Sequence, residues 1–314
     1  MGKILILLFF VFVLSACASD PAVRLRMATG GAAGTYYPLG RAMAGVIFLN
    51  TDININVMTS GASADNIRQI AAGTADLAIA QNDVMSYAFH GSGIWAGREP
   101  VTNLATLMSL YPETIQIVVR ADSDIFSVSE LAGRRVSIGD EGSGVEANAL
   151  QILDVHGLTS RDISALNMGF SASADAMRDR LIDAFFVTSA TPNAAVLQLA
   201  EEAELRLLPI SESVLRLLKS RYPFYTVITM DYKDYPWLPE PVDTVAVKAT
   251  LITSIDMYEC VAYDIVSTLI INQEYIPHPR AVNLTPYNAV QSVSVEFHPG
   301  ARRFFEQIGA LEQR

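Results

Sequence analysis

Apolar residues recur along most of the chain with two periods, one typical of strands and one typical of helices. Six short apolar runs predict strands at Arg24–Met27, Ile53–Met58, Leu77–Ala80, Ile115–Arg120, Arg135–Ile138 and Ala184–Val187. Four amphipathic runs predict helices at Leu39–Leu49, Ser63–Ala72, Val145–His156 and Ala174–Leu181. Because the two kinds of segment alternate, the pattern predicts an α/β fold with largely parallel strands.

Two passages share one order of features. Residues 65–81 and 175–188 each contain an amphipathic helix, a tight turn, an aspartate and an apolar strand with a polar end. This likeness indicates either two similar α/β domains or only the pattern that any βαβ unit repeats. Open α/β sheets bind ligands at the carboxyl ends of their strands. Gln81 and Thr188 are therefore predicted at equivalent edges of two sheets.

Two further strand-like stretches, Thr114–Arg120 and Tyr222–Met230, bracket the central part of the chain. If the chain leaves one domain by the first stretch and returns by the second, the two stretches form a two-strand hinge. We then expect domain I at residues 24–114 and 228–314, and domain II at residues 115–227. A ligand cleft would lie between the two α/β domains.

The first residues are typical of an export signal. The apolar run at residues 4–14 is too short to span a bilayer, but it suits the hydrophobic region of a signal peptide. The tetrapeptide LSAC that ends at Cys17 resembles a bacterial lipobox. It predicts a signal peptide at residues 1–16, acylation of Cys17 and a lipidated tether at residues 17–23, and two or three acyl chains anchor a protein stably. The alternative is a signal peptide that ends beside a cysteine by chance.

Composition narrows the classes of function. The chain has 314 residues, of which 51% are apolar and 18% charged, with a formal net charge of −11. Such a chain folds into one or two domains, and its acidic balance argues against diffuse binding to nucleic acid. Cys260 lies in an apolar segment with helical spacing, which predicts a buried structural residue and not a nucleophile. The two cysteines and four scattered histidines form no metal motif, so we expect no metal.

Two glycine-rich loops, each between a predicted strand and a predicted helix, are candidate ligand sites. They have the sequences ATGGAAGTYYPLG at residues 28–40 and SIGDEGSGVE at residues 137–146. Glycine lets the backbone approach a ligand, and free N–H groups at a helix start favour an anion. The first loop has neither the dinucleotide nor the P-loop spacing, and it could serve only as a turn. We expect the two helix starts to clamp a small carboxylate, with the Ser143 hydroxyl and N–H taking part.

Other polar residues are weaker candidates. Ser60 and Ser63 lie between a strand end and a helix, where one serine can cap the helix. This leaves Ser60, at the strand end, as a candidate contact. Asp140 and Glu141 could form an acid and base pair, but neighbouring loop carboxylates are usually solvated. Without a recognisable nucleophile motif, we expect binding and no enzymatic activity.

Four segments in this order carry a family resemblance. They are TGGAAGTYYPLG, SGASADNIRQIAAGTADLAIAQND, VVRADSDIFSVSELAGRRVSIGDEGSGVEANAL and VEFHPGARRFFEQIGAL. They resemble the TAXI family of TRAP-transporter solute-binding receptors over nearly all of the mature chain. The resemblance implies a periplasmic-binding-protein fold of type II, a glutamate-like amino acid or other small organic acid as ligand, and delivery to a sodium-coupled TRAP permease. It implies no cofactor and no nucleic-acid partner, and it fits a periplasmic lipoprotein held at the membrane.

The resemblance also implies the ligand-binding residues. The glycine-rich loops, the second-strand serine and the QxD segment supply Gly31, Gly34, Thr35, Tyr36, Ser60, Gln81, Asp83, Ser143, Gly144, Val145 and Glu146. Thr188 and Ser189 are added, although the sequence TSATP departs there from the family pattern of a small residue and glycine before proline. For glutamate, Asp83 or Glu146 would accept hydrogen bonds from the ammonium group.

No arginine aligns with the one that holds the substrate in the dicarboxylate branch of TRAP receptors. We expect surface charges or structural pairs at Arg41, Arg120 and Arg135. Hydroxyl and backbone N–H groups would then hold a carboxylate. Two alternatives share the same cleft, namely a membrane-tethered solute sensor or accessory lipoprotein, and an ABC-type solute-binding protein.

Overall fold

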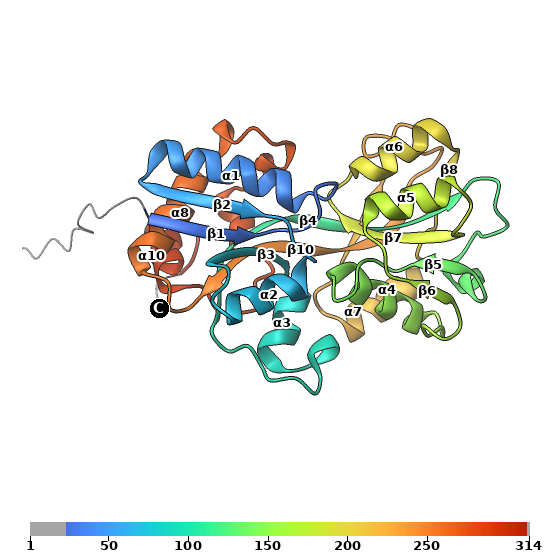
Figure 1. Cartoon of the computed structure of the whole chain (residues 1–314), viewed down its shortest axis with the longest axis horizontal. Coiled ribbons are helices and arrows are strands. Elements are labelled where there is room, and N and C mark those ends of the chain that lie inside the picture. Colours follow the sequence, from blue (N-terminus) through green and yellow to red (C-terminus); the bar gives the residue numbers. More distant parts are fainter. Residues whose placement is uncertain (1–22, 313–314) are drawn as a thin grey trace, which may run out of the picture.

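Two lobes joined by long strands make up the part of the chain that the computed structural model describes, residues 23–312 (Figure 1). The predicted signal peptide and Cys17 lie outside the described residues. Four clusters of buried side chains divide the rest, two in each lobe with few exceptions. We define lobe 1 as residues 23–113 and 248–312, and lobe 2 as residues 114–247.

The first half of the chain builds lobe 1 and enters lobe 2. Its elements are β1 (Val23–Ala28), α1 (Tyr36–Asn50), β2 (Ile53–Met58), α2 (Ser63–Ala71), β3 (Leu77–Gln81), α3 (Asn82–His90), η1 (Gly93–Trp95), β4 (Leu104–Arg120), η2 (Val128–Leu131), β5 (Arg135–Ser137) and α4 (Gly144–Val155). The second half completes lobe 2 and returns. Its elements are β6 (Ser164–Leu166), α5 (Phe170–Arg178), β7 (Ala184–Ser189), α6 (Ala194–Glu202), β8 (Leu205–Leu207), α7 (Glu212–Arg221), β9 (Thr226–Met230), β10 (Val242–Ser254), α8 (Glu259–Ile271), η3 (Gln273–Tyr275), η4 (Pro279–Asn283), α9 (Pro286–Ala289) and α10 (Pro299–Gln307).

The predicted α/β fold is confirmed. Every predicted strand and helix overlaps an observed element of the same kind. The largest shift is in β4, which begins at Leu104 and not at Ile115. The helix expected at Ala174–Leu181 begins earlier, at Phe170, and ends at Arg178, close before the left-handed backbone of Arg180 with φ +57°. The local hydrophobic pattern therefore fixes the type of element better than its ends.

One sheet passes through both lobes, and its centre is antiparallel. The order is β2-β1-β3-β10-β4-β7-β5-β6, with β8 beside β4 and β9 beside β10. The pairs β1-β2, β1-β3, β5-β6 and β5-β7 are parallel, whereas all pairs made by β4 and β10 are antiparallel. The prediction of largely parallel strands therefore holds only for the pairs that do not include β4 or β10, because the chain leaves lobe 1 by β4 and returns by β10 in the opposite direction.

The two crossing strands correct the expected return to domain I at residue 228. The first crossing lies within β4, close to the predicted boundary at residues 114–115, because Tyr111 packs in lobe 1 and Ile115 in lobe 2. The return is made by β10. Residues 226–230 form β9, which pairs with the lobe 2 end of β10, and Tyr235 and Leu238 are buried in lobe 2.

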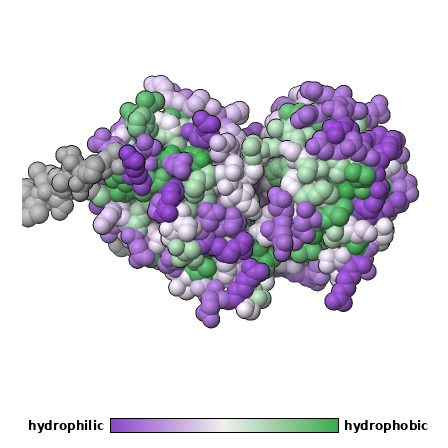
Figure 2. Space-filling view, in the orientation of Figure 1, coloured by the Kyte–Doolittle hydropathy of each residue, from purple (hydrophilic) through white to green (hydrophobic). Residues whose placement is uncertain are grey.

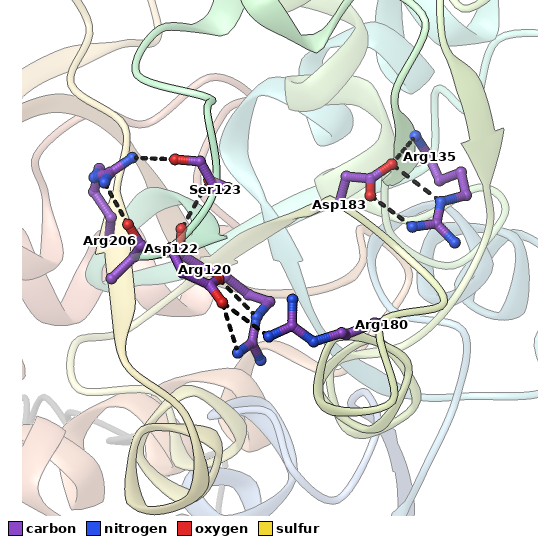
Figure 3. Close-up of polar contacts among 8 residues, drawn as sticks. Arg120, Asp122, Ser123, Arg135, Arg180, Asp183 and Arg206 are labelled. Atoms are coloured by element: carbon purple, nitrogen blue, oxygen red, sulfur yellow. Dashed lines mark hydrogen bonds and ion pairs between the residues drawn. The ribbon is translucent and has the colours of Figure 1, made fainter.

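An equivalent ion pair in each lobe supports the interpretation of two similar domains. In lobe 1, Asp76 precedes β3 and bonds to the backbone N–H of Arg26 (2.8 Å) and to its guanidinium (3.0 Å). In lobe 2, Asp183 precedes β7 and bonds in the same way to Arg135, at 2.8 Å and 2.6–3.0 Å (Figure 3). Each pair joins matching parallel strands, β1 with β3 and β5 with β7. The repeated Asp-strand pattern in the sequence therefore marks a repeated structure.

Cys260 packs against the core of lobe 1, but it is half-buried and not fully buried as expected. It is not a free thiol in the structure. Within residues 23–312, no helix is long and apolar enough to cross a membrane.

Candidate ligand-binding site

A cavity of about 50 Å³ lies where the two lobes meet, and the surface is notched between the lobes (Figure 2). Lobe 1 contributes the lining residues Gly30, Gly31, Gly34, Thr35, Tyr36, Ala62, Ser63, Gln81 and Glu113. Lobe 2 contributes Gly144, Val145, Phe170, Thr188 and Ser189. The two sets come from matching elements of the repeat, since both include the starts of two helices and the end of one parallel strand.

Four helices begin at this cavity. Their first residues are Tyr36 of α1, Ser63 of α2, Gly144 of α4 and Phe170 of α5, and all four line it. The first turn of a helix carries unpaired backbone N–H groups and the positive end of the helix dipole. Such ends bind anions without the help of a basic side chain. Among the lining residues there is no lysine, arginine or histidine, so these dipoles supply the positive potential of the cavity.

One glycine allows the lobes to approach each other closely at the cavity. A methyl group on Gly144 of lobe 2 would overlap the side-chain amide of Gln81 in lobe 1. A methyl carbon on Gly34 of lobe 1 would lie 3.6 Å from the ring of Phe170 in lobe 2. The contact between the lobes therefore requires glycine at position 144, whereas at position 34 a methyl group would make an ordinary contact with Phe170.

One carboxyl group is buried in the cavity. Glu113 lies at the crossing point of β4, is 2% exposed, and accepts a hydrogen bond of 2.6 Å from the hydroxyl of Tyr36. The pKa of Glu113 is raised to about 8, chiefly by burial; the hydrogen bond from Tyr36 lowers the pKa, and the nearby Asp83 raises it, within that net value. The side chain is therefore largely protonated at neutral pH.

Two other polar atoms in the cavity, unlike the Glu113 carboxyl group, have no hydrogen-bond partner in the structure. They are Oε1 of Gln81, at the end of β3, and Oγ1 of Thr188, near the end of β7. Both side chains are at least 95% buried. Buried polar atoms are normally paired. A ligand with hydrogen-bond donors would satisfy both atoms.

Nine of the thirteen residues expected in the site line the cavity. They are Gly31, Gly34, Thr35, Tyr36, Gln81, Gly144, Val145, Thr188 and Ser189. Four expected residues do not line it: Ser60, Asp83, Ser143 and Glu146. Sequence reasoning missed Gly30, Ala62, Ser63, Glu113 and Phe170.

Local hydrogen bonds explain two of the four exceptions, Ser143 and Glu146. Ser143 is the N-cap of α4, and its hydroxyl accepts a bond of 3.1 Å from the N–H of Glu146. The Glu146 carboxylate accepts bonds from the N–H of Gly142 (2.7 Å) and from Asn167 (3.0 Å). Both side chains therefore hold the loop before α4 in place rather than facing the cavity.

Neither Ser60 nor Ser63 has the role expected for it. Ser60 bonds to Asn66 (2.5 Å) and to the N–H of Ala62 (3.1 Å), within its own loop. Ser63 lines the cavity and accepts a bond of 3.1 Å from the N–H of Gln81, while the N-cap of α2 is Ala62, with φ +64°. The helix starts without a serine cap, which leaves Ser63 at the ligand side.

Asp83 belongs to a chain of buried hydrogen bonds that joins the lobes beside the cavity. Asn148 of α4 donates to Oδ2 of Asp83 (2.9 Å) and to the hydroxyl of Tyr225 (3.0 Å). Tyr225 donates to Gln151 (2.6 Å), and Gln151 donates to the hydroxyl of Tyr87 on α3 (3.0 Å). Burial raises the pKa of Asp83 to about 6. We call this set, Asp83, Tyr87, Asn148, Gln151 and Tyr225, the interlobe network.

The other charged residues considered in the sequence lie away from the cavity. Asp140 and Glu141 are exposed. Arg120 pairs with Asp122 at 3.0 Å (Figure 3), and Arg135 with Asp183, while Arg41 is exposed above the ring of Tyr37. The arginines are surface charges or structural pairs, as predicted.

A protein-family model described as the NMT1-like family matches residues 27–309, almost the whole described chain. The chain belongs to the NMT1-like family. This match accounts for both lobes together, since its range begins in β1 and ends beyond α10.

Solved structures similar to this NMT1-like chain include an alkanesulfonate-binding protein and a periplasmic binding protein. The alkanesulfonate-binding protein SsuA from Xanthomonas axonopodis pv. citri, bound to MOPS, is 18% identical, with 94% of this chain and 81% of SsuA covered and a TM-score of 0.53. The periplasmic binding protein BugD is 12% identical, with 92% and 98% covered and a TM-score of 0.60. At such identities the likeness establishes the fold, a type II periplasmic binding protein with two α/β domains.

Proposed function

We propose that this NMT1-like chain is an extracytoplasmic solute-binding receptor that holds a small organic acid or amino acid between its lobes and delivers it to a membrane permease. The observation that carries the proposal is the meeting of four helix starts, two from each lobe, at one cavity. A carboxylate there can bond to N–H groups of both lobes at once. The fold supports the same function.

Because the residues that line the cavity come from both lobes, binding of a ligand there favours closure of the lobes. A ligand that touches Tyr36 and Ser63 on one side and Gly144 and Thr188 on the other makes all its contacts only when the lobes are together. A ligand shifts such an equilibrium by the difference between its affinities for the two states. We propose that the lobes move about β4 and β10, the two strands that run through both of them.

A thermal-shift screen tests the proposal. The soluble chain from Ala18 onward is measured against amino acids, dicarboxylates, keto acids and sugars. A ligand at about a hundred times its Kd adds about 2.7 kcal/mol, a shift of several degrees. A hit among the acids or amino acids is expected, whereas a folded protein without any hit in these classes would contradict the proposal.

A matched pair of variants places the ligand in the cavity. Thr188→Tyr fills the cavity from β7, and we expect it to abolish the shift caused by the ligand. Thr226→Tyr adds the same ring to an exposed position of β9 and should leave the shift unchanged. Equal shifts in both variants would mean that the ligand binds elsewhere.

Two classes of permease are candidates for the partner. The order of motifs that resembles the TAXI family favours a sodium-coupled TRAP permease, with a glutamate-like ligand. The fold likeness to the sulfonate-binding protein SsuA favours the second candidate, an ABC-type solute-binding protein. Uptake by vesicles that contain the permease of an adjacent gene separates them, since a TRAP permease requires a sodium gradient and an ABC transporter requires ATP.

We also propose a periplasmic location with a lipid anchor on Cys17. The support is the apolar run followed by LSAC in the sequence. Phase partition into detergent should retain the full chain, and Cys17→Ser should release it. The competing fate of Cys17 is a disulfide with Cys260, the other cysteine of the chain, and the intact mass of the mature protein distinguishes acylation from oxidation.

A further inference from the structure

The cavity combines two opposite electrostatic features. Four helix starts favour a negative group, as described above, while Glu113 places a carboxyl group in the same space. Glu113 is the only lining residue with an ionisable carboxyl group. A ligand with only a negative charge would be attracted by the helix starts and repelled by an ionised Glu113, and a ligand with only a positive charge would experience the reverse.

Within residues 23–312, no basic side chain neutralises Glu113. Its neighbours are the hydroxyl of Tyr36 from α1, Tyr111 from its own strand β4, and Asp83 from α3. Lys248 stands on β10 opposite Pro112, and burial alone lowers its pKa, without a contribution from Glu113. Arg280 of η4 donates a hydrogen bond to the carbonyl of Thr191, and its positive charge lowers the pKa of Tyr111. A buried carboxylate without a counter-charge is unfavourable, so the empty site keeps the proton.

Polar groups that line the same cavity as Glu113 match the donors of an ammonium group. An ammonium has three N–H donors, and the cavity offers three acceptors: the Glu113 carboxylate, Oε1 of Gln81 and Oγ1 of Thr188. The last two are buried and have no other partner. The residues that the sequence suggested for this role, Asp83 and Glu146, do not line the cavity.

We infer that Glu113 receives a cationic amine of the ligand, so that the site selects small zwitterions, such as α-amino acids, over acids of the same skeleton without the amine. This inference rests on the proposed function. On binding, the Glu113 O–H bond breaks, its proton leaves to solvent, and the carboxylate pairs with the ammonium. The ligand carboxylate turns toward the helix starts.

Isothermal titration of matched ligand pairs tests the inference. Each pair consists of an α-amino acid and the α-hydroxy acid with the same side chain, measured at pH 6, 7 and 8. We expect the amino acid to bind at least about tenfold tighter, and its affinity to rise about tenfold from pH 6 to pH 7. Titrations at pH 6.5 in buffers with different ionisation enthalpies should show the release of about one proton per ligand. The affinity of the α-hydroxy acid should stay level from pH 6 to pH 7.

Variants separate this role from a structural one. Glu113→Gln should lower the affinity for the amino acid about tenfold or more and remove both its pH dependence and the proton release. The affinity of this variant for the α-hydroxy acid should differ from the wild-type value by less than about threefold. Tyr36→Phe removes a hydrogen bond that stabilises the carboxylate and should move the pH dependence to higher pH. Glu99→Gln, at an exposed glutamate, is the matched control and should change none of these.

Failure of the inference about Glu113 can be distinguished from failure of the proposed function. Equal affinity within the pairs, or amino-acid binding without proton release, overturns the inference and leaves the solute receptor standing. An unchanged affinity of Glu113→Gln for the amino acid would also overturn the inference and leave the solute receptor standing. If the wild-type protein binds neither member of any pair, the proposed ligand class and the inference fall together. Should Glu113→Gln not fold, the pairs and the proton release in the wild-type protein still decide.

Discussion

Glu113 should make the stability of the empty protein depend on pH in a defined direction. Burial raises the pKa of this group from an ordinary value of 4.5 to about 8. Between these two pH values the folded protein therefore binds more protons than the unfolded chain. The stabilisation by the neutral form is complete below the lower pKa, and stability decreases as the pH rises toward the higher one.

The magnitude follows from the linkage of proton binding to folding. A difference of one proton changes the free energy of unfolding by about 1.4 kcal/mol per pH unit. For Glu113 alone, the loss between pH 5 and pH 7 is about 2.5 kcal/mol. In a protein of this size it corresponds to a fall in Tm of about 5–10 °C. Asp83, whose pKa is raised to about 6, acts in the same direction, so the effect must be isolated by a variant.

Glu113→Gln isolates it, because glutamine has a similar shape and no proton to lose. Urea unfolding of the ligand-free protein at pH 5, 6 and 7 gives the free energy of unfolding for both chains. The variant should gain about 2.5 kcal/mol over the wild-type protein as the pH rises from 5 to 7. Glu99→Gln should stay parallel to the wild-type protein. A difference between Glu113→Gln and wild type that is constant within about 0.5 kcal/mol would refute the reasoning.

Two further substitutions test the contact between the lobes. Gly144→Ala should lower the affinity for the ligand about tenfold and leave the empty protein folded, because the methyl group displaces the Gln81 amide. Gly45→Ala, in open space on α1, is the control and should bind the ligand with wild-type affinity in the same titration. Equal affinities of the two variants would exclude the role of Gly144. Asn148→Ala removes the hydrogen bonds that its side chain donates to Asp83 and to Tyr225, and so cuts the interlobe network at Asp83. We expect a loss of about 1–3 kcal/mol in stability and a more open shape by X-ray scattering, and an unchanged Tm and scattering profile would contradict this role.

Sequence reasoning found the helix starts at the site because their signal is local. Glycine and serine between an apolar strand and an amphipathic run mark a strand-to-helix turn, and parallel strands bring such turns to one edge of a sheet. This pattern marked the two loops as candidate sites, the family resemblance singled out Gly34, Tyr36, Gly144 and Val145 within them, and these residues line the cavity. The repeated Asp-strand pattern located Gln81 and Thr188 for the same reason.

The residues that were missed depend on contacts between distant parts of the chain. Glu113 stands in the run LYPETIQIVV, where a single acidic residue beside Pro112 interrupts an apolar strand. That signal was present, but only the meeting of the lobes shows that the side chain faces a cavity. Phe170 gave no signal, since an apolar residue at a helix start is ordinary. Asp83 was misplaced because α3 begins directly after β3 and turns this residue toward Asn148 of the other lobe.

The connection of the lobes has a practical consequence for anyone who labels this protein. The described chain begins in β1 and ends beyond α10, and both lie in lobe 1 (Figure 1), so lobe 2 is an insertion whose own ends are the two crossing strands. A pair of fluorescent reporters attached at the two ends of the described chain would both sit on lobe 1, so the distance between them would not report closure. An optical sensor built from this protein needs one dye within residues 114–247, for example on the exposed face of α6 or α7, and the other on lobe 1.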